Sequence, residues 1–431
     1  MKLEELTEEE FEQFAYKNPL FSFHQTKEWA NLKKTNGWDH KYVGLVENKE
    51  IKAATLLLSK KAFLKFKMFY SPRGFLIDYN NEQLVNTFTS YLKKYIKKNN
   101  GFFIKIDPYL ENIERDIDGN PVENGINNEK VVNYLKKIGY KHYGFNKDTE
   151  KELQPRWIYV LDINGKSEDV IFDEFSKDTK RYINRCLKQG LCVDEITMDN
   201  IDEFKKIMEH TSSRRGFIDR PISYYKNMID TLGDHIKILY SYLDTDKWQS
   251  ELDEEANNIK IEEAKVEEKI KENPDSKKTK DAKKQLENSI NQLNKKQDEL
   301  NELKNKYGTK IVMASSMFII YHNEIIYLYS GSYDYFMKYN PQYLIQWEII
   351  KYCIKNNIPR YNFYGIDGNF DKNDNEMYGI YEFKRGFGGH VIEFIGEFDL
   401  VINKLVYGMY KIAFWLYKKL KTIKFMIRRK K

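Results

Sequence analysis

Residues 41–58, KYVGLVENKEIKAATLLL, contain two runs rich in apolar and β-branched residues joined by a polar turn, which predicts a β-hairpin. Residues 310–330 repeat this pattern and predict a second hairpin of similar character. A segment with helical periodicity follows each hairpin, at residues 82–98 after the first and 343–356 after the second. The repetition predicts an α/β protein built from two related subdomains.

A helical arm is predicted between Trp248 and Tyr307, where the chain has neither an aromatic residue nor a glycine. Apolar residues in each half of this stretch recur mostly at alternating four- and three-residue spacings, which is the pattern of a coiled-coil seam. They are Leu252, Ala256, Ile259, Val266 and Ile270, then Leu286, Ile290, Leu293 and Leu300. The sequence Asn273-Pro274-Asp275-Ser276 supplies a proline and a capping serine between the halves, so the chain is expected to reverse there. An acidic first half and a basic second half favour antiparallel pairing.

The net charge of +6 is concentrated at the carboxyl-terminal end of the sequence. Its cations there are Lys418, Lys419, Lys421, Lys424, Arg428, Arg429, Lys430 and Lys431. The preceding residues 405–417 are apolar and aromatic but too few to span a bilayer. This composition is typical of a segment lying on an anionic membrane, where each Lys or Arg contributes about 1 kcal/mol. The alternative is a terminal helix packed on the core with a basic end.

The acidic stretch 1–12 lacks the apolar run of a secretion signal, so a cytoplasmic location is expected, peripheral at the inner face of the membrane through the tail. The sequence shows no motif for metal binding or for a covalent catalytic nucleophile. The three cysteines, Cys186, Cys192 and Cys353, are too scattered for a disulfide framework or a zinc site. We found no histidine ligand pattern, no phosphate-binding loop and no G-x-S-x-G motif, and we expect neither a metal nor a cofactor.

Several separated segments of the sequence resemble the FemABX family, the peptidyltransferases of peptidoglycan interpeptide bridge synthesis. Early segments include HQTKEW at residues 24–29, followed by Leu32-Lys33, and Ile106-Asp107-Pro108. Later segments include the basic stretch 176–188, SRRGFIDRPISYY at 213–225, YLYSGS at 327–332, YGIDG at 364–368, FKRGFG at 383–388 and the stretch 393–399. These segments occur in the order of the family's motifs over nearly the whole chain.

The resemblance implies two GNAT-like subdomains with a substrate channel between them and a helical arm similar to that of seryl-tRNA synthetase. Residues 1–155, completed by 397–431, are expected to form the first GNAT-like subdomain. Residues 156–245 and 308–396 are expected to form the second, and 246–307 the antiparallel coiled-coil arm. The expected fold class is therefore α/β with an inserted arm.

The resemblance also implies an aminoacyltransferase. The amino acid, expected to be Gly, Ala or Ser, would pass from an aminoacyl-tRNA to the stem-peptide amine of lipid II or UDP-MurNAc-pentapeptide, and the basic tail favours lipid II. An aminoacyl ester is already activated, so holding both reactants in place can supply roughly 7 to 11 kcal/mol of the barrier reduction. Two alternatives stay open: a non-tRNA acyltransferase on the same fold, and an inactive scaffold of the cell-wall machinery.

Two catalytic residues are implied by the family's motifs. Lys384 is expected to neutralise the tRNA end or the developing oxyanion. Asp107 is expected to orient or deprotonate the acceptor amine, although an Asp-Pro at a strand end also forms turns. Phe383 is expected either to pack in the core or to stack on a base.

Five further residues are implied as substrate-binding groups. Lys33 and Arg220 would bind the diphosphate of the precursor, and Tyr224 its sugar, where a surface ion pair is the alternative role for the cations. Tyr327 and Tyr329 alternate along one strand, so both are expected to share the face that lines the channel. The alternative for either tyrosine is an ordinary core or surface position.

Overall fold

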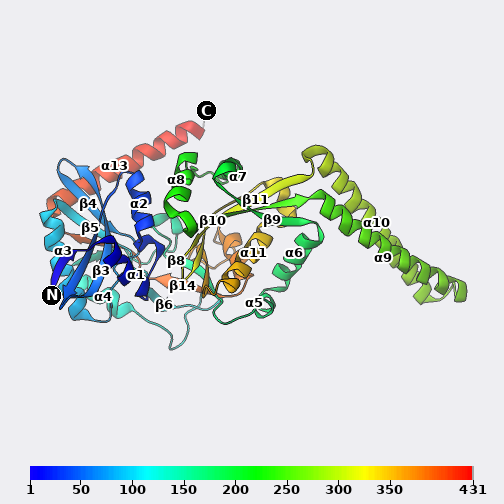
Figure 1. The fold of residues 1–431 in the computed structure, drawn as a ribbon, viewed down its shortest axis with the longest axis horizontal. Coiled ribbons are helices and arrows are strands. Elements are labelled where there is room, and N and C mark those ends of the chain that lie inside the picture. Colours follow the sequence, from blue (N-terminus) through cyan, green and yellow to red (C-terminus); the bar gives the residue numbers. More distant parts are fainter. Residues whose placement is uncertain (430–431) are drawn as a thin grey trace.

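The computed structural model describes residues 1–429, and the side chains of residues 150, 418 and 420–429 are outside that description. Figure 1 shows an elongated molecule in which two sheets and their helices form a body, and a long helix pair projects from one end. The predicted basic tail lies largely outside the described residues. Lys430 and Lys431 lie outside entirely, and Lys418, Lys421, Lys424, Arg428 and Arg429 lie outside by their side chains.

The first half of the body is a seven-stranded sheet with four helices. Its strands, in spatial order, are β1 (Lys2–Glu5), β2 (Asp39–Glu47), β3 (Glu50–Phe63), β4 (Phe66–Ser71), β5 (Gly101–Ile106), β15 (Phe398–Val401) and β7 (Tyr140–His142). Its helices are α1 (Glu8–Lys17), α2 (Lys27–Thr35), α3 (Glu82–Lys98) and α4 (Glu129–Lys137). Helices α3 and α4 cover one face of the sheet, while α1 and α2 cover the face that looks toward the second half.

The second half is an eight-stranded sheet. Its strands, in spatial order, are β6 (Glu111–Glu114), β14 (His390–Phe394), β8 (Trp157–Asp162), β13 (Arg360–Gly365), β12 (Ile325–Ser332), β11 (Lys310–Ile320), β10 (Ile236–Asp244) and β9 (Leu191–Ile196). Its helices are α5 (Glu168–Glu174), α6 (Lys177–Lys188), α7 (Ile201–Arg215), α8 (Ile222–Leu232), α11 (Pro341–Lys355) and α12 (Tyr378–Arg385). The two halves share one apolar core, to which both α2 and α8 contribute.

The two halves repeat the same connections. In the first sheet β2, β3 and β4 pair antiparallel, α3 follows, and β5 returns parallel to β4. In the second sheet β10, β11 and β12 pair antiparallel, α11 follows, and β13 returns parallel to β12. The predicted α/β fold with two GNAT-like subdomains and an inserted arm is confirmed.

The sequence pattern pairs hairpin 41–58 with hairpin 310–330, but these two hairpins do not occupy equivalent positions in the two sheets. Hairpin β2–β3 corresponds to the pair β10–β11, and β11–β12 corresponds to β3–β4. The difference arises because the helical arm occupies the turn between β10 and β11, so these two strands appear in the sequence as separate segments.

The arm forms as its sequence predicts, from the two long helices α9 (Thr245–Glu272) and α10 (Lys277–Tyr307). Ser276 caps α10 by accepting a hydrogen bond from the Thr279 backbone N–H at 3.1 Å, and the chain reverses at this point. Ile259, Val266 and Leu286 are buried in the seam between the two helices. At its base, Trp248 is buried in a cluster that includes residues of β11 and α11, so the arm is anchored in the second half.

The chain passes between the halves more than once. Strand β6, within residues 1–155, pairs with β14 of the second sheet, and β15 returns to the first sheet beside β5. The predicted subdomain boundaries therefore stay a proposal. The last helix, α13 (Lys404–Arg429), packs its amino-terminal turns against β5. No helix among residues 1–429 is both long and apolar enough to cross a membrane.

Candidate functional site

Helix α2 and the segment just before α8 bring two predicted binding cations together where the halves meet. The Lys33 ammonium lies 4.0 Å from the centroid of the Trp29 ring, and the Arg220 guanidinium lies 5.3 Å from that of Tyr224. Burial lowers the pKa of Lys33 to about 8, and the charge of Arg220 lowers it as well. Neither cation forms an ion pair with a carboxylate of the described residues, which makes this end of the interface suited to an anionic ligand.

Asp107 lies deeper, at the carboxyl end of β5, where it is 4% exposed. Its carboxylate accepts hydrogen bonds from the Tyr70 hydroxyl at 2.9 Å and from the Arg73 backbone N–H at 2.8 Å. Burial raises the pKa of Asp107 to about 7, although the Arg73 charge and both hydrogen bonds act to lower it. A carboxyl group with this pKa can accept or release a proton near neutral pH.

His24 and Gln154 connect the two cations with Asp107. His24 is fully buried, and its burial, together with the charges of Arg73 and Lys33, lowers its pKa well below the ordinary value. A hydrogen bond to Gln154 opposes this shift only in part. The imidazole is therefore neutral at physiological pH and can donate or accept a hydrogen bond without adding charge.

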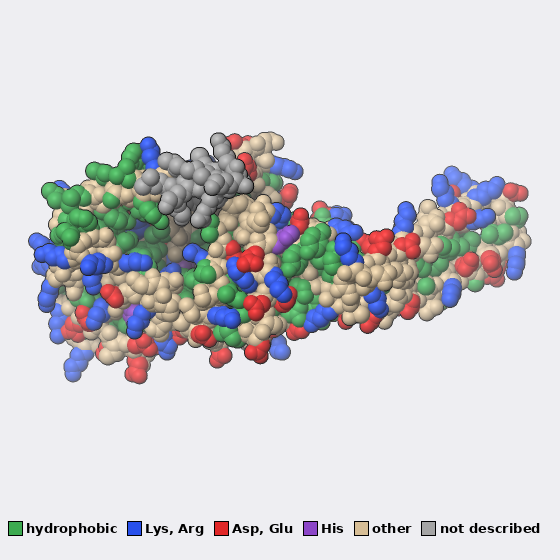
Figure 2. Space-filling model, turned by 90° about the horizontal axis from the view of Figure 1, so that it is seen from above, with side chains coloured by type: hydrophobic (Ala, Val, Ile, Leu, Met, Phe, Trp, Pro, Cys, Tyr) green, Lys and Arg blue, Asp and Glu red, His purple; other side chains and the backbone are tan. Residues whose placement is uncertain are grey.

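A row of tyrosines from the second half faces these groups. The hydroxyl of Tyr364 donates to Gln154 Oε1 at 2.9 Å. Tyr329 lies within electrostatic reach of both Tyr364 and Tyr224, and together with burial it raises the pKa of each hydroxyl. Figure 2 looks onto the side of the body that carries α2, α8 and α13 in Figure 1, and this side is hollowed with Lys and Arg side chains at its edge.

Two residues near Asp107 have a left-handed backbone conformation that side chains rarely adopt. The φ angles are 53° at Arg73 and 63° at Tyr364. Arg73 is 2% exposed, donates from Nη2 to the Pro155 carbonyl at 2.7 Å, and stacks 4.6 Å from the centroid of Phe394. Strained backbone persists where surrounding contacts determine it, and it clusters at functional sites.

Lys384 lies on α12 and is 5% exposed. Its ammonium donates to the carbonyl of Gly365 at 2.6 Å and to that of Tyr364 at 3.3 Å. Burial lowers the pKa of Lys384 to about 7. Lys384 therefore reaches the candidate site through the backbone of Tyr364, whereas Phe383 packs against Tyr343 with ring centroids 4.8 Å apart.

Tyr327 and Tyr329 do not share one face of β12, so that expectation is wrong. The register shifts between Met317 and Phe318 of β11, which leaves Tyr329 opposite Met317 and Tyr327 opposite Phe318. This bulge adds a residue to β12 and turns the two tyrosines to opposite faces. Tyr327 is buried in the core of the second half, and Tyr329 packs toward the first half.

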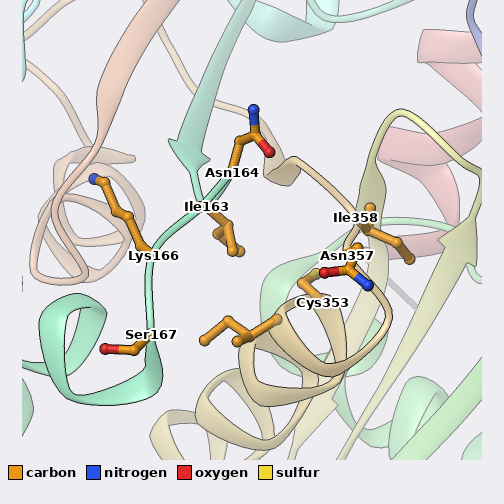
Figure 3. Close-up of a pocket in the computed structure, with 9 residues that line it drawn as sticks. Ile163, Asn164, Lys166, Ser167, Cys353, Asn357 and Ile358 are labelled. Atoms are coloured by element: carbon orange, nitrogen blue, oxygen red, sulfur yellow. The ribbon is translucent and has the colours of Figure 1, made fainter.

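A pocket elsewhere in the second half is a poor candidate for chemistry. It has a volume of about 300 Å³ between the end of β8 and the end of α11, and its lining includes Lys166 and Cys353 (Figure 3). Burial raises the pKa of the Cys353 thiol, so it stays protonated. Lys166 pairs with Glu174 at 2.9 Å, and none of the predicted site residues lines this pocket.

The site that the halves form thus contains Lys33, Arg220, Tyr224, Tyr329 and Asp107 among the predicted residues. Tyr70, Arg73 and Gln154 belong to it as well, although no spacing pattern in the sequence indicated them. His24 and Tyr364 lie inside quoted motifs, HQTKEW and YGIDG, but nothing in the sequence gave them a role.

Comparisons with known proteins agree along almost the whole chain. A family model described as the FemAB family matches residues 6–414. An aminoacyltransferase FemA of Staphylococcus epidermidis is 34% identical over 416 residues, covering 95% of this chain and 98% of that protein. FemA of Staphylococcus aureus is 32% identical over 411 residues, covering 95% and 97%. A crystal structure of FemX has 27% identity and a TM-score of 0.77, covering 95% of this chain and 99% of that one.

Proposed function

The chain belongs to the FemAB family and is an aminoacyltransferase, and on that premise we propose that it builds the interpeptide bridge of peptidoglycan. The proposed donor is an aminoacyl-tRNA carrying Gly, Ala or Ser. The proposed acceptor is the stem-peptide amine of lipid II, with UDP-MurNAc-pentapeptide as the soluble alternative. Relatives named as aminoacyltransferases argue against an inactive scaffold, and the RNase treatment in the test below separates an aminoacyl-tRNA donor from a non-tRNA donor.

One observation carries the proposal: two cations without carboxylate partners among the described side chains, Lys33 and Arg220, lie at one end of a site that ends in a buried carboxyl group, Asp107. A diphosphate needs cations that are not already neutralised. An attacking amine needs a group nearby that can take its proton. A precursor that carries both a diphosphate and an amine would engage both ends of this site.

The proposed reaction forms one amide bond and breaks one ester bond. The acceptor amine attacks the ester carbonyl, the ribose oxygen leaves with the electron pair of the broken bond, and the proton lost by the amine ends on that oxygen. Asp107 is proposed to carry this proton, because its pKa of about 7 permits both uptake and release. Lys384 is proposed to stabilise the negative charge on the tetrahedral intermediate or on the tRNA end.

The proposed substrate contacts follow the positions of the remaining side chains. Arg220, Lys33 and Tyr224 are proposed to bind the diphosphate and sugar, with Tyr329 extending the same wall toward Tyr364. Tyr327 and Phe383 are proposed to support this wall from the core of the second half. The basic tail is proposed to bring the protein to the inner face of the membrane, where lipid II would be available.

The test is transfer of labelled amino acids from a pool of charged tRNA to purified lipid II and, separately, to UDP-MurNAc-pentapeptide. We expect label in the precursor, its loss after RNase treatment, and a much higher KM for Arg220→Ala. Lys52→Ala is the matched control, because Lys52 is a cation paired with Glu50 on the far hairpin turn. Absence of transfer to either acceptor would contradict the proposal.

A further inference from the structure

The tip of the hairpin between β3 and β4 exposes two large apolar side chains. Phe63 is 51% exposed and Leu64 is 68% exposed, and neither joins a hydrophobic cluster of the described chain. Leu64 also has a φ of 49°, a conformation that hairpin turns usually assign to Gly or Asn. Leucine at this position therefore costs stability in the isolated protein, both in its backbone and in its contact with water.

Helix α13 carries a stripe of apolar side chains on the side that faces away from the body. The stripe follows helical spacing, so its members share one face. They are Leu405, Met409, Ile412 and Leu416, which are 73%, 44%, 64% and 49% exposed. The opposite side of the helix packs Val406, Tyr407 and Tyr410 against Phe102 and Phe103 of β5. The body thus fixes the amino-terminal turns of the helix and leaves its outer stripe uncovered.

The hairpin and the helix are neighbours although more than three hundred residues separate them in the sequence. Phe66 and Met68, which begin β4 directly after the tip, pack in the same cluster as Val406 and Tyr407 of α13. Figure 2 shows hydrophobic side chains gathered at one end of the same side of the body that is hollowed. The tip 63–64 and the outer stripe of α13 are called the docking surface below.

Cations predominate around the docking surface, although Lys67 pairs with the exposed Asp39 at 3.3 Å. Lys60, Lys61, Lys65 and Lys67 flank the hairpin tip, and residues 51–77 contain no Asp or Glu. Residues 400–431 also lack acidic residues, while the sequence beyond 417 is rich in Lys and Arg. Within the described chain Lys61 and Lys65 form no ion pair. Exposed apolar side chains ringed by cations complement a bilayer with anionic headgroups.

We propose that the β3–β4 hairpin tip and α13 together form a membrane-docking surface for anionic lipid. The tip enters the headgroup region through Phe63 and Leu64, α13 lies along the interface with its stripe toward the acyl chains, and the lysines contact lipid phosphates. This inference deepens the proposed function, because it places the hollow of the site on the side of a lipid-linked acceptor.

Sedimentation with vesicles tests the docking surface directly. The full chain is mixed with vesicles of phosphatidylglycerol and phosphatidylethanolamine, or of phosphatidylcholine alone, in the absence of any precursor. We expect binding to the anionic vesicles that weakens about tenfold in Leu64→Asn and in Ile412→Asn, and little binding to phosphatidylcholine. Asparagine favours the left-handed turn at position 64, so Leu64→Asn keeps the fold while it removes the apolar side chain.

Ile261→Asn is the matched control, because Ile261 is 56% exposed but lies on the arm. This variant should bind like the wild type. Equal binding by all variants would overturn the docking surface, and so would self-association that Ile412→Asn abolishes without any binding to vesicles. The rate of transfer to soluble UDP-MurNAc-pentapeptide separates the two proposals. If both are correct, Leu64→Asn and Ile412→Asn lose vesicle binding but keep the wild-type transfer rate. If only the proposed function is wrong, the wild type shows no transfer but still binds the anionic vesicles.

Discussion

Asp107 is buried and hydrogen-bonded, and its pKa is raised to about 7. A carboxyl group with this pKa can exchange a proton at physiological pH. If Asp107 takes the amine proton, kcat/KM should rise with pH up to about 7 and then level off. Asp107→Asn should lower kcat/KM by about a hundredfold and remove this rise. Single-turnover transfer rates from pH 5.5 to 8.5 measure both effects, and an unchanged pH profile would assign the proton to another group.

The same group predicts a pH dependence of stability. Burial raises the folded pKa of Asp107 to about 7, above the unfolded value of about 4, so the folded state holds the proton more tightly. The stability it contributes is complete below pH 4 and is lost as the pH rises through 7. We expect the melting temperature to fall less between pH 6 and 8 in Asp107→Asn than in the wild type. Calorimetry at the two pH values decides this, with Asp281→Asn as a control at an exposed carboxylate of the arm.

The lowered pKa of Lys33 predicts that substrate binding weakens as the pH rises. Burial lowers its pKa to about 8, so its charge, and with it the affinity for a diphosphate, should decline above pH 8. Lys33→Arg should extend binding to higher pH, because a guanidinium stays charged, while Lys33→Ala should raise KM about tenfold or more at pH 7 and by a smaller factor at pH 9, where the wild-type lysine has itself lost most of its charge. Precursor titrations at pH 7 and 9 separate the two variants; similar losses at both pH values in the wild type and Lys33→Arg would exclude this role.

Among the elements, strand β12 shows how a bulge separates two residues that look equivalent. Tyr327 is buried with Phe318, so Tyr327→Ala should destabilise the protein by about 3 to 5 kcal/mol. Tyr329→Ala should leave stability nearly unchanged and raise KM for the precursor, since Tyr329 borders the site. Urea unfolding and steady-state kinetics on both variants provide the comparison. Equal stability losses would place both side chains in the core.

The arm was the element most accessible to sequence analysis, and the site was the least. A coiled-coil seam can be predicted from the spacing of apolar residues along the chain, and Val266 and Leu286 are buried as that spacing predicts. The bulge in β12 depends on pairing with β11, which local spacing does not record. Tyr70, Arg73 and Gln154 join Asp107 only through tertiary structure, whereas Lys33 and Arg220 were found because they occupy motifs of a known family.

At the scale of the whole molecule, the halves share one apolar core, and a buried polar contact fixes the segment that crosses from the first sheet to the second. The Tyr109 hydroxyl, just beyond β5, donates to the Glu324 carboxylate in the β11–β12 turn at 2.9 Å. Asn362 donates to the same carboxylate at 2.9 Å, and Glu324 is 3% exposed. Tyr109 also stacks on Phe394 of β14, so this contact holds the crossing segment on the second sheet. The halves themselves cannot separate without exposing the apolar surface of their shared core.

This coupling predicts that the body unfolds in one transition. Tyr109→Phe should lower its stability by about 1 to 3 kcal/mol without splitting that transition, because a buried carboxylate loses one donor. Circular dichroism and intrinsic fluorescence should report coincident denaturant midpoints in the wild type and in the variant. Two separate midpoints would show that the halves fold independently.

Asp244 and Lys310 face each other in the ladder between β10 and β11, so the whole arm is topologically a single hairpin loop. An insertion whose two ends already touch can lengthen, shorten or disappear over evolution while the sheet that carries it stays intact. Selection can therefore change the length of the arm without changing the reaction centre. Family members with arms of different length are compatible with the same chemistry.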